Sequence, residues 1–207
     1  VTDPEAPILL WSIDNQTTDL GEMGEPWAQP RLAKVNDNGT LKVVAFIPAG
    51  YDKNEDLRYG QNQKFPDETD DDTANGSAVV QSQLGDGGLD TNGDGYTSSG
   101  TSEPYNPHGR GMYAIEVAEL VLVSDKYNPV FSNTGTVVWN YTHADNGDLD
   151  YSFPSNMTLL QGNNGLASKI YIGDTGARRW RFDVSGTDPD LWDGEILHMN
   201  LLLVVAS

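Results

Sequence analysis

The sequence predicts an all-β fold, an antiparallel β-sandwich or barrel of the jelly-roll type with long loops. Many short runs rich in β-branched and aromatic residues alternate with turns rich in Gly, Asn and Asp, and no stretch has a convincing amphipathic helical period. One run, residues 112–124, is long enough for a central strand. A single domain over residues 1–207 is ordinary for an all-β chain of this length, so we expect one core.

The run 112–124 predicts a central strand because both of its faces are mostly apolar. About thirteen residues would span roughly 40 Å at about 3.3 Å per residue, which suits a large sandwich. Glu116 and Glu119 also allow a helix, but the β-branched residues and the Gly-Arg-Gly at 109–111 favour a strand. The alternating faces carry Tyr113, Ile115, Val117, Val121 and Val123 on one side and Met112, Ala114, Ala118, Leu120 and Leu122 on the other.

The N-terminal part begins with a short apolar run at 8–13, which we expect to form a first strand or an arm that packs onto a neighbour. Pro26 and Pro30 disfavour a helix across 17–31, so this stretch predicts an extended loop.

The strongest hairpin signal follows. The apolar runs 32–35 and 41–47 flank Asn36-Asp37-Asn38-Gly39, and Pro48 ends the second run.

Residues 49–107 predict a long surface excursion, because acidic residues gather at 67–72 and Gly, Ser, Thr and Asn dominate afterwards. Within it, only 78–84 alternates well enough for a strand. Loops of this length in a compact domain usually carry a function or form an interface.

The remaining chain predicts further short strands separated by turn residues, with at most a turn near 189–192. We expect nine or ten strands in all. The further strands are 136–142, 157–161, 168–172, 178–184 and 195–206.

The charge is extreme: 31 acidic against 12 basic residues give a formal charge of -19. Such a surface disfavours nucleic acid and anionic membranes as direct partners, because phosphate binding needs clustered Lys and Arg. Self-repulsion is screened within about 3 Å at about 1 M salt, so the composition favours a very salty solvent. The alternative is an ordinary acidic secreted bacterial domain.

The chain has no cysteine, which excludes disulfides, thiolate metal sites and cysteine nucleophiles. The sequence shows neither a signal peptide nor an apolar run of about eighteen residues, so we expect a soluble mature chain.

The sharpest local motif is Asp90-Thr91-Asn92-Gly93-Asp94-Gly95, which matches the first half of a calcium-binding loop. Asp90, Asn92 and Asp94 would supply side-chain oxygens to Ca²⁺ or another hard cation. Thr101 stands where such a loop places a bidentate Glu, and Glu103 would substitute only if the loop bulges. A solvated acidic loop is the alternative, and we expect no required cofactor.

Catalysis is not expected. The three histidines, His108, His143 and His198, lack the spacing of metal ligands, and no G-x-S-x-G elbow is present. Carboxylates are so abundant that a pair for glycoside hydrolysis carries no information.

Three arginines, Arg178, Arg179 and Arg181, are a quarter of all basic residues. On a strand, Arg179, Arg181 and Asp183 would share a face, and guanidinium groups bind carboxylates in bidentate fashion. We therefore expect an interface with the acidic loops of a neighbouring subunit, with cross-strand ion pairs inside the chain as the alternative.

An acidic, cysteine-free, all-β chain with a long excursion and an apolar last strand at 196–206 resembles the single jelly-roll major capsid proteins of icosahedral, membrane-containing haloarchaeal viruses. The resemblance implies a virion shell subunit that assembles into capsomers with identical or related capsid subunits, close to the viral internal membrane and without catalysis. The alternative is a secreted haloarchaeal cell-surface or carbohydrate-binding β-sandwich module. The five tryptophans do not cluster in sequence, which favours core positions over a sugar-binding platform.

Overall fold

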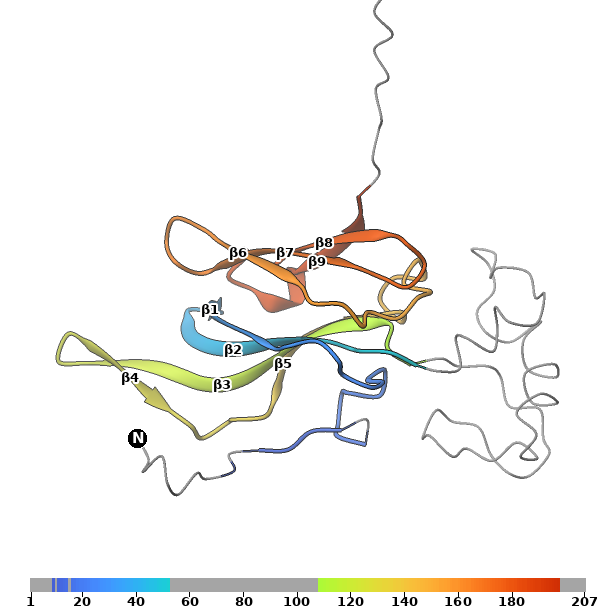
Figure 1. Ribbon diagram of the computed structural model, residues 1–207. Helices are drawn as coiled ribbons and strands as arrows, with labels where there is room; N and C mark the ends of the chain where they lie inside the picture. The colour runs from blue at the N-terminus through green and yellow to red at the C-terminus, as the bar shows by residue number, and fades with distance from the viewer. Residues whose placement is uncertain (1–8, 10, 15, 53–107, 198–207) are drawn as a thin grey trace, which may run out of the picture.

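The structure is a computed structural model that describes residue 9 and residues 11–14, 16–52 and 108–197. In this part of the chain nine strands form two antiparallel sheets, which lie one above the other in Figure 1. The predicted all-β antiparallel sandwich is therefore confirmed.

The first sheet is organised around its longest strand, β3. The first half of β3 pairs with β5, and the second half pairs with β4 on the same side, while β2 lies on the other side. The sheet order is β1-β2-β3-β4, with β5 joined to β3. Its members are β1 (Arg31–Asp37), β2 (Thr40–Pro48), β3 (Gly111–Val123), β4 (Lys126–Val130) and β5 (Val137–Thr142).

The β1–β2 hairpin closes where the sequence predicted it. Asn38 and Gly39 form the two-residue loop, and both have positive φ angles, of 50° and 93°. Such a loop needs left-handed backbone at both positions, which Asn and Gly adopt at little energetic cost.

The second sheet is a simple meander in which each strand pairs with its neighbour in sequence, in the order β6-β7-β8-β9. The turn predicted near 189–192 is a short 3₁₀ helix, η1 (Pro189–Leu191), between the last two strands. The strands are β6 (Thr158–Gln161), β7 (Ala167–Gly173), β8 (Arg179–Asp183) and β9 (Asp193–Ile196).

Jelly-roll order is not confirmed. A jelly roll consists of two Greek keys, in which a strand returns by a long connection to lie beside an earlier one. Within the described residues, β1 to β5 all belong to one sheet and β6 to β9 to the other. The strand predicted at 78–84 and most of the one predicted at 195–206 lie outside the described residues.

The main core fills the space between the two sheets. Inward-facing residues of β2, β3 and β5 meet those of β7 and β8, and the aromatic rings pack mainly edge to face. Phe182 is fully buried, with ring centroids 6.0 Å from Trp139, 6.2 Å from Phe153 and 5.7 Å from Tyr141. Aromatic pairs at such distances add to the stabilisation that burial provides.

A second, smaller core covers the other face of the first sheet. Tyr113 and Ile115 of β3 are fully buried there beneath Leu20 and Met23, and the half-buried Trp11 and Ile13 pack against the same cluster. The described part of the predicted run 8–13 thus forms no strand and contacts the chain's own sheet. The N-terminal segment that carries Leu20 and Met23 is also fixed by the buried Arg110, whose guanidinium donates to both carboxylate oxygens of Glu22 at 3.3 and 3.4 Å.

Candidate interaction surfaces

A β-bulge in the middle of β3 changes which face each residue of this strand occupies. Val44 pairs with Glu116 and Val43 pairs with Ala118, so Val117 has no partner on β2. An extra residue of this kind reverses the alternation of side chains beyond it. Even-numbered residues of β3 point into the main core before the bulge and follow the outer face of the sheet after it.

A buried ion pair marks the bulge. The Glu116 side chain is 1% exposed and lies 2.8 Å from Lys42 Nζ, which also contacts Asp37 at 2.7 Å. Burial alone lowers the pKa of Lys42, but hydrogen bonds and the charges of Asp37 and Glu116 outweigh it and raise the pKa above its ordinary 10.5. A carboxylate this deeply buried is stable only because Lys42 neutralises it.

Beyond the bulge, the second half of β3 and β4 leave the sandwich as a projecting hairpin (Figure 1). We call residues 120–131 the hairpin arm. Every residue from Val121 to Phe131 is exposed, and six of the eleven exposed large apolar side chains among the described residues lie here. The six are Val121, Leu122, Val123, Tyr127, Val130 and Phe131. The arm is therefore the main apolar surface in this part of the chain.

The register of the arm separates its two faces, because directly paired residues of an antiparallel ladder lie on the same face. Leu120 pairs with Pro129 and Leu122 with Tyr127, so one face is apolar throughout except for the tyrosine hydroxyl. We call these four residues the apolar face of the arm. On the opposite face, Val121 and Val123 alternate with polar and charged groups, since they pair with Asn128 and Lys126.

The outer edge of the arm resists pairing with another strand. Ser124 and Asp125 have φ angles of 50° and 62°, which defines a two-residue hairpin loop closed by Val123 and Lys126. Hydrogen-bonded and non-hydrogen-bonded pairs alternate from that closing pair, which puts Pro129 in a non-hydrogen-bonded pair with its nitrogen on the free edge. That edge therefore lacks one of the N–H donors that an added strand requires.

The predicted arginine interface lies on and beside β8, where Arg178 and Arg181 bind acidic groups of the same chain. Arg178 precedes β8 and donates to the Asp148 carbonyl and to Asp150 Oδ2, the latter at 3.2 Å. Its guanidinium also lies 4.9 Å from the centre of the Tyr151 ring. Burial raises the pKa of Asp150 in spite of the nearby Arg178 and His143. Arg178 therefore holds the loop after β5 against the second sheet.

The outer face of the second sheet carries cross-strand ion pairs. Arg181 of β8 pairs with Glu195 of β9, and Lys169 of β7 contacts Asp183 at 2.9 Å. Hydrogen bonds from Ser185 and then from Lys169 lower the pKa of Asp183 to about 2. Arg179 is exposed on the same face, as the strand prediction required. The cross-strand alternative thus describes Arg181, while Arg178 binds a loop of the same chain. An intersubunit role for the three arginines stays a prediction.

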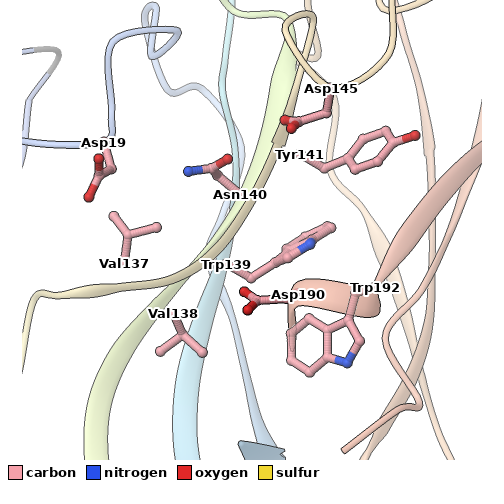
Figure 2. Close-up of a pocket in the computed structure, with 9 residues that line it drawn as sticks. All are labelled: Asp19, Val137, Val138, Trp139, Asn140, Tyr141, Asp145, Asp190 and Trp192. Atoms are coloured by element: carbon pink, nitrogen blue, oxygen red, sulfur yellow. The ribbon is translucent and has the colours of Figure 1, made fainter. Parts of the chain in front are cut away.

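A shallow hollow of about 350 Å³ lies beside β5, and Figure 2 shows carboxylates of Asp19, Asp145 and Asp190 around it. Asp145 accepts hydrogen bonds from the backbone and hydroxyl of Thr142, so it stabilises the turn after β5. Trp139 and Trp192 line the hollow but are only 6% and 4% exposed. These two tryptophans therefore offer no open aromatic platform for a sugar.

The predicted cation loop at Asp90, Asn92 and Asp94 lies outside the described residues, as does the acidic cluster at 67–72. In the described ranges, no three His, Asp or Glu side chains come close enough together to hold a metal ion. No helix among the described residues is long and apolar enough to cross a membrane.

Comparisons with known protein families, with curated proteins and with solved structures find no match for this chain. Sequence reasoning found β3 but missed β4, and with it the arm. The available signal was the short polar step Ser124-Asp125-Lys126 between two apolar stretches, which is typical of a tight hairpin.

Proposed function

We propose that this chain is a structural protein, the major shell subunit of a capsid of a virus of a halophilic archaeon, which assembles into capsomers with other capsid subunits. The observation that carries the proposal is the hairpin arm. A soluble protein rarely leaves a contiguous apolar surface on a projecting element unless another molecule covers it. We propose the virion shell as the location.

The charge of the chain supports this assignment. At -19, two copies in dilute buffer repel each other, while concentrated salt screens that repulsion and strengthens apolar contacts. The arm itself contains one acid, Asp125, and one base, Lys126, so its formal charge is zero. A neutral apolar projection on an acidic body favours assembly in a salty solvent.

Light scattering tests the proposal through the molar mass of the intact chain in about 3 M salt and again after dilution to about 0.1 M, where the screening length grows from below 3 Å to about 10 Å. We expect oligomers in concentrated salt that dissociate on dilution. A monomer at every salt and protein concentration would contradict a shell subunit. Chelator added at constant high salt tests separately whether a cation at Asp90, Asn92 and Asp94 strengthens assembly.

A secreted cell-surface or carbohydrate-binding module is the second candidate, and one observation favours it. Trp27 is 64% exposed and its ring centroid lies 4.8 Å from that of Tyr51, which gives a small aromatic surface of the kind that stacks on sugars. Glycan binding by a monomer, lost in Trp27→Ala, would support this candidate over the shell subunit.

A further inference from the structure

From the arm we infer a specific contact: the apolar face of the arm, formed by Leu120, Leu122, Tyr127 and Pro129, packs against the same face of a second copy of this chain. The inference rests on the proposed function and adds the surface, the partner and the mode of contact.

Charge favours a second copy as the occupant. The apolar face carries no charged side chain, whereas the opposite face carries Glu119 and Lys126. Two chains of -19 each approach most easily where neither presents a carboxylate. A basic partner would instead be attracted to the acidic body. A membrane with anionic lipids would repel the body while the arm approached it.

The edge chemistry selects contact between faces over strand addition. Pro129 removes an N–H donor from the free edge of β4, so a second β4 cannot complete a regular ladder there. Contact through the apolar face needs no backbone donor, because the free energy of this contact comes from burying side chains. Contact of one patch with its own copy is isologous, which generates a two-fold axis.

The size of the arm sets the strength of the contact. Five residue pairs span about 17 Å, and two strands lie about 4.8 Å apart. The area of one such face is well below the roughly 800 Å² that each partner buries in a stable complex. We therefore expect weak pairwise association that becomes strong only where several contacts act together, as in a closed shell.

The opposite orientations of two neighbouring residues supply a matched test. Leu122 and Val123 are 57% and 53% exposed, and they point to opposite faces of the same strand. Leu122→Glu and Val123→Glu add the same charge to the arm at nearly the same exposure. Sedimentation velocity of both full-length variants in concentrated salt then compares the two faces directly.

We expect Leu122→Glu to weaken self-association at least about tenfold, because contact would bury an unpaired carboxylate. Val123→Glu should stay within about twofold of the unchanged chain. Both variants should unfold at the same denaturant concentration as the parent, since neither side chain is buried. Equal effects on association, or a larger effect of Val123→Glu, would overturn the inference.

A second measurement uses the absence of cysteine from the sequence. A single Leu122→Cys or Val123→Cys gives each chain one thiol, and a short bismaleimide joins two copies whose thiols lie close together. We expect covalent dimers from Leu122→Cys and few from Val123→Cys. The reverse yield would place the contact on the other face and overturn the inference.

The two proposals fail in different ways. A parent chain that is monomeric under all conditions would contradict the proposed function as a shell subunit. If the parent assembles and Leu122→Glu does not change that assembly, the proposed shell function still stands and only the proposed contact through the arm is contradicted. Binding of the parent to neutral phosphatidylcholine vesicles in concentrated salt, lost in Leu122→Glu, would identify a lipid surface as the occupant and also overturn the inference.

Discussion

The two halves of β3 have the same apolar character and opposite surroundings. Before the bulge, Met112 to Ile115 are fully buried, covered by the second sheet on one face and by the N-terminal segment on the other. Beyond it, Val121 to Val123 are exposed. The pattern of apolar residues therefore indicates that β3 forms a strand, but it does not indicate what buries that strand. The residues that cover each half must come from elsewhere in the chain or from another molecule.

The largest expected difference between the halves is in folding stability. Ile115→Ala removes a fully buried side chain from the smaller core and should reduce the free energy of unfolding by about 2–5 kcal/mol. Leu122→Ala on the arm should change it by less than about 0.5 kcal/mol. Urea denaturation at a protein concentration low enough to keep the chain monomeric measures both. Similar losses at the two positions would mean that the arm is covered within a single chain.

The second largest expected change in folding stability comes from the bulge between the two halves of β3. Lys42→Met leaves the Glu116 carboxylate buried without its lysine partner and should destabilise the fold by about 3 kcal/mol. Adding Glu116→Gln should recover part of the loss, because the variant then buries a neutral amide. Urea denaturation of both single variants and the double variant gives the coupling energy. Simple additivity of the two changes would show that the pair does not stabilise the bulge.

The same pair gives a pH dependence with a defined sign. The folded pKa of Lys42 lies above its ordinary 10.5, so its contribution to stability is complete below pH 10.5 and is lost as the pH rises through the folded value. Burial also raises the pKa of Tyr113, so part of the alkaline loss belongs to that residue. The difference between the parent and Lys42→Met isolates the lysine contribution, and it should shrink above pH 10.5.

Local patterns predicted the strands well because their causes are local. Asn38-Gly39 identified the first hairpin, and period-two alternation placed Arg179, Arg181 and Asp183 on one face of β8. Sheet membership was less accessible, since the pairing of β3 with both β4 and β5 depends on contacts distant in sequence. The ion-pair partners of Arg178 and Arg181 are also distant in sequence, and the acidic residues are too numerous for composition to identify which of them form the pairs.

The smallest expected effect concerns the turn of the arm. Ser124 and Asp125 both adopt left-handed backbone, which costs a non-glycine residue roughly 1 kcal/mol, whereas Asn-Gly adopts it readily. Replacing the pair by Ser124→Asn and Asp125→Gly should stabilise the arm by about 1 kcal/mol and slow amide exchange on β4 about fivefold. Global stability should not change, because the arm opens without disturbing either core.

Hydrogen exchange followed residue by residue provides its own control. The β1–β2 turn already contains Asn38 and Gly39, so its amide exchange should be the same in the double variant and the parent. If exchange slowed equally in β1 and on the arm, the arm would unfold together with the sandwich, and the contrast between the halves of β3 would be lost. Slowing confined to the arm would show that its order depends on its own turn and ladder, which leaves the apolar face of the arm preformed for contact with a second copy.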